Sequence, residues 1–386
     1  MEQRPKLLDL FCGIGGLSLG LERAGFDPLG GVDCWEDAAK TFEHNHAPRQ
    51  CLLGDVSKLR ASDIEEFFGI GREQIDVMAG GPPCQGFSTV GKRDSKDPRN
   101  KLWEHYLKLV TEIRPAYVLI ENVEGLVVMD RGGVCERIVA NFAKIGYRVN
   151  WKLLRSADYG VPQLRKRVIF IATLDGLAEP SFPARTVPEH VSVADAIFDL
   201  PALASGESAV QYDKSPSTRY QKARRGKVRI LRNHQAANHP SHLVEVLNHI
   251  PDGGNRKSIP DHLQPKSGFH NSYARLASNK PAVAVTSNMR KPSSARATHP
   301  TQPRGLTVRE GLRLQTFDDS FEVLGSRTSQ YLQVGNAVPP LLGEVIGRQL
   351  LEAYHANSQR ALRAARSRPA VEIKVAVQRQ LTLELA

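Results

Sequence analysis

Long apolar runs, paired cysteines and a charged leader are all missing from this sequence of 386 residues. No stretch of about 18 apolar residues is present, which excludes a membrane-spanning helix of ordinary length. The five cysteines are scattered and form no C-x-x-C pair, so neither a disulfide framework nor a zinc site is expected. Since the sequence opens on an apolar segment, KLLDLF, and not on a secretion signal, we expect a cytoplasmic protein with reduced thiols and no bound metal.

Acidic residues are absent from His262 to Arg304. Between residues 184 and 304 there are eighteen lysines and arginines against eight acids, and this segment holds most of the net charge of +11. Positive charge that is concentrated in one segment is typical of a surface that binds a polyanion such as nucleic acid. A solvated basic face without a partner is the alternative that charge alone leaves open.

Short apolar segments alternate with amphipathic ones through the first half of the sequence. The segment 75–79 is typical of a buried strand, and in 100–114 Tyr106, Leu109 and Ile113 fall on one helical face with Leu102. This β-α order predicts an α/β fold with a doubly wound, mostly parallel sheet. Ligands of such sheets bind at the carboxyl ends of the strands, where the unusual segments of this chain also fall.

One of these segments is DLFCGIGGLSLG, at positions 9–20. Its glycines allow the backbone to approach a ligand closely at the turn from strand to helix. Asp33, twenty residues after Gly13, ends the second predicted strand, where an acid can accept hydrogen bonds from a ribose. Asp55 ends the third predicted strand. The pattern favours a cofactor that contains adenosine, and Ser18, which replaces a glycine of the G-x-G-x-x-G pattern, argues against a dinucleotide.

A second segment is GGPPCQGFS, at positions 80–88. Pro82 and Pro83 fix the backbone directly before Cys84, which suits a nucleophile that must be held at one height above a pocket. The other four cysteines are read as small buried apolar residues. Glu121 ends the next predicted strand, and a carboxyl group beside a thiol suits proton donation to a ring nitrogen while sulfur adds to the ring.

Six segments together resemble the DNA (cytosine-5) methyltransferase family of the compact bacterial or phage type. They occur in the order of that family's motifs: DLFCGIGGLSLG, GGPPCQGFS, ENVEGL, SADYGVPQLRKRVIFIA, LTVREGLRLQTF and QVGNAVPP. The resemblance covers roughly residues 6–183 and 305–350. It implies the fold of the methyltransferases that use S-adenosylmethionine, with a smaller domain for target recognition.

The resemblance also implies roles for individual residues. Cys84 would attack C6 of a cytosine, Glu121 would contact N3, and Arg167, with Arg165 beside it, would hold O2. A cytosine stacked in a duplex must first be flipped out. The cofactor S-adenosylmethionine would be bound by Phe11, Gly13, Gly15, Gly16, Leu17, Asp33, Asp55, Val56, Pro82, Asn336 and Ala337.

The same comparison divides the chain into four parts. Residues 1–183 would form the catalytic and cofactor-binding domain, 184–304 the target-recognition domain, 305–355 the return to the catalytic domain, and 356–386 a tail. The arginine- and alanine-rich start of the tail is expected to be helical and the rest extended. We expect a monomer that acts on double-stranded DNA at the nucleoid. The sequence leaves two alternatives open: a restriction-modification enzyme with a cognate restriction endonuclease, which it need not contact, or an orphan methyltransferase.

Eight of the twelve histidines lie between residues 184 and 304, including His234, His239, His242 and His249. They are expected at the surface or facing DNA, and not as metal ligands. Within the same segment, Arg224 is expected to contact phosphate.

Two other functions stay open at this point. An RNA cytosine-5 methyltransferase would carry a Cys-Phe-Thr signature, which is absent here. A catalytically silent DNA-binding regulator would have lost Cys84 or Glu121, and both are present.

Overall fold

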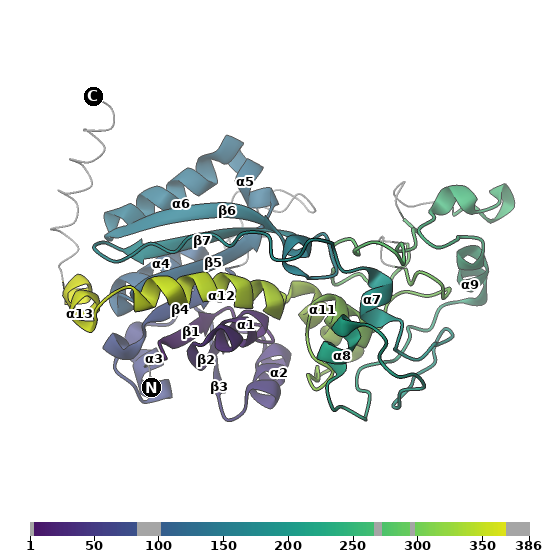
Figure 1. Cartoon of the computed structure of the whole chain (residues 1–386), viewed down its shortest axis with the longest axis horizontal. Coiled ribbons are helices and arrows are strands. Elements are labelled where there is room, and N and C mark those ends of the chain that lie inside the picture. The colour runs from purple at the N-terminus through teal and green to yellow at the C-terminus, as the bar shows by residue number, and fades with distance from the viewer. Residues whose placement is uncertain (1–3, 83–101, 266–271, 294–297, 368–386) are drawn as a thin grey trace. The chain divides into compact units, whose positions relative to one another are not determined.

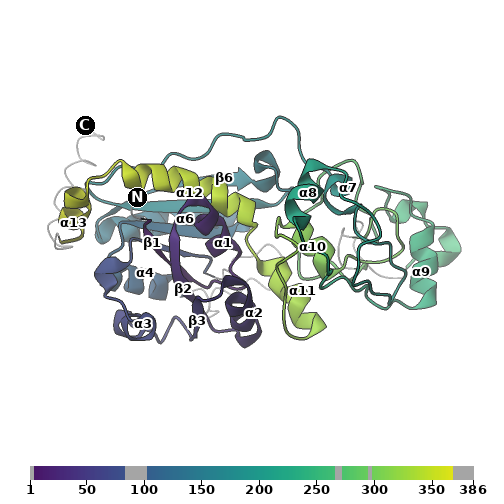
Figure 2. The ribbon, with the colours of Figure 1, turned by 60° about the horizontal axis from the view of Figure 1, so that its bottom comes forward.

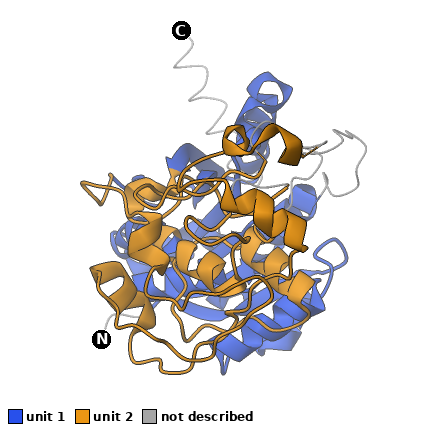
Figure 3. Ribbon diagram, turned by 90° about the vertical axis from the view of Figure 1, so that its right-hand side faces the viewer, with its two compact units in different colours: residues 1–154, 166–184, 343–386 blue, residues 155–165, 185–342 orange. Residues whose placement is uncertain are grey.

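The computed structural model describes residues 4–82, 102–265, 272–293 and 298–367. The chain divides into two compact units. Unit 1 consists of residues 1–154, 166–184 and 343–386, and unit 2 of residues 155–165 and 185–342 (Figure 3). Residues 305–342 thus cluster with the segment predicted to recognise the target, and the chain returns to unit 1 at Gly343 and not at 305.

Unit 1 is built on a sheet of seven strands in the order β3-β2-β1-β4-β5-β7-β6 (Figure 1). The pairs β1·β2, β2·β3, β1·β4 and β4·β5 are parallel, and β5·β7 is antiparallel. The predicted α/β class and the mostly parallel sheet are confirmed. The strands are β1 Lys6–Leu10, β2 Asp27–Asp33, β3 Gln50–Leu53, β4 Val77–Gly80, β5 Tyr117–Val123, β6 Tyr147–Arg155 and β7 Lys166–Leu174.

Helices connect these strands and cover the sheet. In α4, the predicted helical face is confirmed: Tyr106, Leu109 and Ile113 are buried, and Leu102 is half-buried. The helices of unit 1 are α1 Gly16–Ala24, α2 Glu36–His46, α3 Ala61–Phe68, α4 Leu102–Ile113, α5 Gly125–Val128, α6 Gly133–Lys144, α12 Pro340–His355 and α13 Gln359–Ser367, with short 3₁₀ turns at Arg72–Gln74 and Met129–Gly132.

Helix α12 packs closely against α1, although more than 300 residues separate them in sequence (Figures 1 and 2). A Cβ atom on Gly343 would lie 3.3 Å from the Cα of Gly20, and one on Gly347 would lie 2.7 Å from the Cβ of Ala24. Any larger side chain at these two positions would push the helices apart. The glycines of α12 are therefore required for this contact.

Helix α13 confirms that the arginine- and alanine-rich start of the tail is helical. Leu362 and Ala365 are buried, and Arg366 anchors the end of the helix. The Arg366 guanidinium donates to the carbonyls of Arg114 at 3.1 Å and Glu73 at 2.6 Å, while Arg114 Nε donates back to the Arg366 carbonyl at 2.9 Å. These bonds fix α13 where β4 and β5 begin.

Unit 2 contains short helices and much irregular chain. Its elements are α7 Val193–Ile197, α8 Arg219–Arg225, α9 Ser241–Asn248, α10 Val308–Leu314 and α11 Arg327–Asn336, with 3₁₀ turns at Ser156–Tyr159, Arg256–Ser258 and Asp261–Leu263. Every residue of α10 is buried. Its Arg313 donates to Asp319 at 2.5 Å and to Asp199 at 3.1 Å. A buried guanidinium is tolerable only with such partners, so these bonds tie the flanking chain to α10.

No helix in the described part of the chain combines the length and the apolarity that crossing a bilayer requires.

Candidate functional site

The predicted acid, Glu121, lies on β5, where it pairs with Ile169 of the neighbouring strand β7. Arg167 Nε is 2.6 Å from Glu121 Oε1, and both side chains are largely buried. Among the described residues, Oε1 has no hydrogen-bond partner, and its contact with Arg167 is an ion pair. A Cβ atom on Gly81 would lie 3.3 Å from the other oxygen, Oε2. The carboxylate is therefore held between an arginine and the start of the Pro-Pro-Cys segment.

Asn122, the neighbour of Glu121, fixes the chain that leads to this segment. Its Nδ2 donates to the Pro82 carbonyl at 3.0 Å, and its Oδ1 accepts from the Val123 N–H at 2.8 Å. The orientation of the amide is thus set from both ends. Cys84 lies outside the described residues, and its predicted role as the nucleophile stays a prediction.

The glycine turn after β1 has the backbone that its sequence predicts. Gly13 and Gly15 have φ of 54° and 81°, and Phe11, which has a side chain, also adopts a positive φ of 58°. Nothing lies within 4 Å of the position that a Cβ atom on Gly13 would take. An L-residue with positive φ is uncommon, and such backbone is found at ligand sites more often than elsewhere. The turn therefore presents open backbone at the carboxyl end of β1.

Asp33 organises this turn. One carboxylate oxygen accepts the Gly13 N–H at 2.8 Å, and the other accepts the Trp35 N–H at 2.9 Å. Burial raises the pKa of Asp33 above its usual value, and these N–H groups oppose the shift. The sequence predicted Asp33 as a ribose ligand, which stays a prediction, but did not reveal that Asp33 joins the turn to the start of α2.

The remaining predicted cofactor residues of unit 1 differ in exposure. Asp55 is exposed just after β3, and the N–H of Ser57, which donates to it at 2.9 Å, lowers its pKa. Val56 and Leu17 are buried, and Phe11 is half-buried with its ring stacked 6.4 Å from that of Tyr106. Phe11, the glycines, Asp33 and Asp55 therefore stand at the carboxyl ends of three adjacent strands.

Two residues beneath the turn were missed by the sequence analysis. Asp9 is buried in β1, where Ser18 Oγ donates to it at 2.5 Å, and burial raises its pKa to about 7. His46 stacks on Phe42, and a Cβ atom on Gly15 would lie 2.2 Å from its ring nitrogen. The sequence alone does not show that Asp9, within an apolar strand, and His46, at the end of a helix, pack beneath the glycine turn.

Arg165 belongs to unit 2 and binds main chain there. It is 3% exposed, and its guanidinium donates to the carbonyls of Val285 at 3.0 Å and Gly335 at 3.4 Å. Two residues earlier, Gln163 donates to the Leu314 carbonyl at 2.8 Å and accepts the Val285 N–H at 3.0 Å. Arg165 thus binds main-chain carbonyls within unit 2, and its predicted contact with cytosine stays a prediction, as does that of Arg167.

Asn336 and Ala337, the predicted cofactor residues of unit 2, lie at the end of α11. Asn336 is exposed, whereas Ala337 is buried and its N–H bonds to the Gln333 carbonyl at 3.1 Å.

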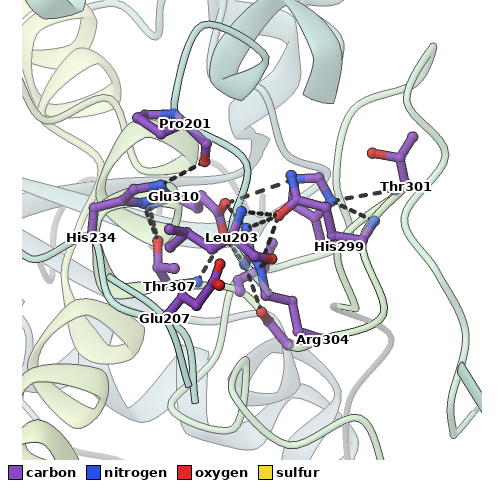
Figure 4. Close-up of polar contacts among 12 residues, drawn as sticks. Pro201, Leu203, Glu207, His234, His299, Thr301, Arg304, Thr307 and Glu310 are labelled. Carbon is purple, nitrogen blue, oxygen red and sulfur yellow. Dashed lines mark hydrogen bonds and ion pairs between the residues drawn. The ribbon is translucent and has the colours of Figure 1, made fainter. Parts of the chain in front are cut away.

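The prediction that the histidines lie at the surface is wrong for two of them. His234 and His299 are 2% and 3% exposed (Figure 4). The two ring nitrogens of His234 lie 3.0 Å from Thr307 Oγ1 and 2.9 Å from the Pro201 carbonyl. His242 and His249 are exposed as expected, and His239 is half-buried. The described residues contain no group of three histidine, cysteine or acidic side chains that could hold a metal ion.

His299 lies beside a buried ion pair of Arg304 and Glu310 (Figure 4). The guanidinium donates to both carboxylate oxygens, at 2.9 and 2.7 Å. Although burial opposes ionisation, Arg304 holds the pKa of Glu310 well below its usual range. Burial lowers the pKa of His299 to about 3, so the ring is neutral in the folded chain.

These shifts predict a loss of stability in acid. Between pH 6.5 and about 3, His299 binds a proton only after unfolding, so the free energy of unfolding falls with decreasing pH, by up to about 1.4 kcal/mol per pH unit for one proton. The neutral variant His299→Gln has an amide oxygen that can accept the Gln302 N–H. It should lower this slope by about 1.4 kcal/mol per pH unit, the contribution of one proton. Urea unfolding at a series of pH values measures both slopes, and equal slopes would contradict the assignment.

Arg224 was predicted to contact phosphate, yet it is engaged inside unit 2. Its guanidinium donates to the Thr316 carbonyl at 2.6 Å and lies 3.0 Å from Asp318 Oδ1. Arg275 is likewise buried and donates to carbonyls, including that of Leu247 at 2.8 Å. The exposed cations between residues 219 and 234 are Arg219, Lys222, Lys227, Arg229 and Arg232.

Comparison with known proteins gives consistent matches along the chain. The family described as C-5 cytosine-specific DNA methylase matches residues 5–352. The Type II methyltransferase M1.HphI of Haemophilus parahaemolyticus is 39% identical over 89% of this chain and 86% of its own. The Type II methyltransferase M.XorII of Xanthomonas oryzae pv. oryzae is 34% identical over 92% of this chain and 87% of its own.

Among solved structures, a prophage-encoded protein of Escherichia coli assigned as a DNA modification methyltransferase superimposes with a TM-score of 0.74. It is 27% identical, and the match covers 91% of this chain and 99% of that one. The Dnmt2 methyltransferase of Schizosaccharomyces pombe, at 19% identity and a TM-score of 0.58, shares the fold.

Proposed function

Because the chain belongs to the family of C-5 cytosine-specific DNA methylases, we propose that Cys84, Glu121 and Arg167 transfer a methyl group to C5 of a cytosine in duplex DNA. The activity, DNA cytosine-5 methylation, is that of the family and of its Type II relatives. We propose which residue carries out each step of this reaction. Its main support is the Glu121–Arg167 pair held beside Gly81 and Pro82.

We propose S-adenosylmethionine as the methyl donor, and the residues around the glycine turn suit it. Open backbone at Gly13 leaves room for a ligand where a side chain would otherwise project. Asp33 and Asp55 offer carboxylates at adjacent strand ends for a ribose and an amino group, and half-buried Phe11 offers an aromatic face for a base. When bound, this cofactor supplies an electrophilic methyl group. Asn336 and Ala337 are proposed as further contacts.

The cysteine and the acid act together on the cytosine ring. The Cys84 thiolate would add to C6, while Glu121 hydrogen-bonds or protonates N3 and so accepts the negative charge that moves into the ring. C5 would become nucleophilic and take the methyl group, whose bond to the sulfonium sulfur of the donor breaks. Loss of the C5 proton to a base, return of the N3 proton to Glu121 and expulsion of the thiolate would then restore the double bond and free Cys84.

Arg167 and Asn122 position these groups. The Arg167 guanidinium is within ion-pair distance of Glu121 and has donors left for the cytosine O2. Asn122 holds the Pro82 carbonyl, two residues before the nucleophile. We propose that this bond sets the height of Cys84 above the base.

Residues 184–304 are proposed to recognise the target. Exposed cations such as Lys227 and Arg229 suit phosphate contacts, and exposed Thr286 and Asn288 have the side chains that read base edges. Since a base in a stack is inaccessible, the cytosine must be flipped into the site of unit 1. We propose that the enzyme acts as a monomer in the cytoplasm, with a cognate restriction endonuclease that shares its target sequence.

Bisulfite sequencing of host DNA tests this function. In cells that express the gene, cytosines within one short sequence should stay unconverted, and cells that express Cys84→Ala should show full conversion. Bisulfite sequencing of tRNA from the same cells tests the alternative function, that of an RNA cytosine-5 methyltransferase. Unconverted cytosines in tRNA alone, or no protected cytosine in DNA with folded protein present, would overturn the proposal.

A further inference from the structure

The glycine turn between β1 and α1 is open at Gly13 and filled at Gly15. No described atom lies within 4 Å of the position that a Cβ atom on Gly13 would take. At Gly15, such an atom would lie 2.2 Å from Nε2 of His46 and 2.7 Å from the ring of Phe42. Two ring side chains of α2 therefore lie directly against the backbone of the turn.

His46, the last residue of α2, is an unusual side chain for this position. It is 3% exposed, and its ring stacks on that of Phe42 with the ring centroids 4.3 Å apart. Phe42 in turn belongs to a buried apolar cluster with Cys12 and Cys51. Burial lowers the pKa of His46 to about 4, although a hydrogen bond with the main chain of Ile14 opposes the shift. The ring is therefore neutral near pH 7, and burying it costs free energy unless it is hydrogen-bonded.

The partner of the His46 ring is the carbonyl group of Ile14, within the turn. Nε2 lies 3.3 Å from this oxygen. A carbonyl oxygen only accepts, so Nε2 must carry the hydrogen, and the neutral ring must be the Nε2–H tautomer. The N–H of the same peptide, that of Gly15, donates to the Cys12 carbonyl at 2.8 Å. Both polar groups of the peptide between Ile14 and Gly15 are thus held, one by α2 and the other within the turn.

A turn with this backbone needs such contacts to keep one conformation. Phe11, Gly13 and Gly15 all adopt positive φ, and glycine populates other regions about as readily. A ligand that binds one conformation binds more weakly when only a fraction of the molecules adopt it. The bond from His46 therefore raises the fraction of molecules whose turn is ready for a ligand.

We propose that His46 is a positioning residue for the cofactor: its Nε2–H holds the Ile14 carbonyl and so keeps the glycine turn in the conformation that binds S-adenosylmethionine. This inference rests on the proposed role of the turn in cofactor binding. His46 acts through the main chain of Ile14 and Gly15 and not through a contact of its own with the cofactor. The effect belongs to the binding step, so it should change KM for the cofactor and not kcat.

Two amide variants separate this hydrogen bond from the rest of the side chain. In His46→Gln the amide nitrogen reaches about as far as Nε2 and can donate to the Ile14 carbonyl, whereas in His46→Asn the side chain is too short. Isothermal titration of the full chain should show that His46→Asn binds S-adenosylmethionine about 10-fold more weakly, the effect of one lost buried hydrogen bond. His46→Gln should stay within about threefold of the unaltered protein, because the bond is restored.

Methyl-transfer kinetics should show the same division. KM for S-adenosylmethionine should rise in His46→Asn by the factor found in the titration, while kcat at saturating cofactor stays the same. The matched control is His44→Asn, which changes an exposed histidine of the same helix and should bind the cofactor normally. Equal affinity of His46→Asn and the unaltered protein would overturn the proposal, and so would a His46→Gln variant that binds as weakly as His46→Asn.

A measurement on the unaltered protein decides the matter even where His46→Asn does not fold. Nitrogen–proton NMR correlation spectra at neutral pH should show the His46 ring uncharged, with its hydrogen on Nε2. A hydrogen on Nδ1, or a charged ring, would overturn the proposal. If the unaltered protein bound no S-adenosylmethionine at all, the proposed cofactor itself would be wrong, and the role of His46 would fall with it.

Discussion

Replacing Cys84 with serine should lower methyl transfer by a factor on the order of 10³ or more, with cofactor and DNA binding retained. A hydroxyl ionises far less readily than a thiol, so the addition to C6 that activates C5 is lost. Single-turnover transfer from labelled S-adenosylmethionine measures the rate, and titrations with DNA and cofactor measure binding.

A covalent trap identifies the nucleophile directly. In duplex DNA with 5-fluorocytosine at the target, fluorine cannot leave as a proton does, so the unaltered enzyme should remain bonded to the base. Cys135→Ala, which alters a buried cysteine of α6, is the matched control and should trap the analogue normally. If Cys84→Ala formed the adduct equally well, the nucleophile would be another residue.

Glu121→Gln should slow the transfer step by about 100-fold or more, the usual range for the loss of a general acid. The amide keeps the size of the side chain but can neither give up a proton nor balance the charge of Arg167, which lies 2.6 Å away. Binding of S-adenosylmethionine should be unchanged, because the glycine turn is built from other strands.

Glu124→Gln provides the control for this experiment. Glu124 lies three residues later in the same segment, is exposed and pairs with Lys166 at 2.9 Å. Its variant should turn over at the normal rate. Normal turnover of Glu121→Gln would instead show that its carboxyl group has only a structural role.

The sequence predicted unit 1 well because local pattern and tertiary environment agree there. The buried strands read as apolar segments, and the glycines of the turn are needed for its positive φ. Glu121 was singled out by the segment ENVEG, which resembles a motif of the family, whereas Asp9, also a buried acid in an apolar strand, was missed. A charged residue in an apolar strand therefore does not by itself distinguish a site residue from a structural one.

Unit 2 was predicted less well because its interior is charged. Arg224, Arg275, Arg304 and Arg313 count as positive charge in a composition, yet in the structure they bond to carbonyls and carboxylates. A sequence does not show which arginines are internal, since the partners come from distant positions. The net charge of residues 184–304, which include the first three of these arginines, therefore overstated the surface available to DNA.

The contact between α1 and α12 has a consequence for synthesis on the ribosome. The sheet of unit 1 is encoded by residues 6–174, but the helix that packs on α1 through Gly343 and Gly347 emerges more than 150 residues later. Until then, the nascent chain carries an uncovered apolar surface, which favours aggregation and engagement by chaperones. Unit 1 can therefore fold to completion only after residues 185–342 of unit 2 have been translated. A product truncated before Gly343 would lack the helix that covers α1.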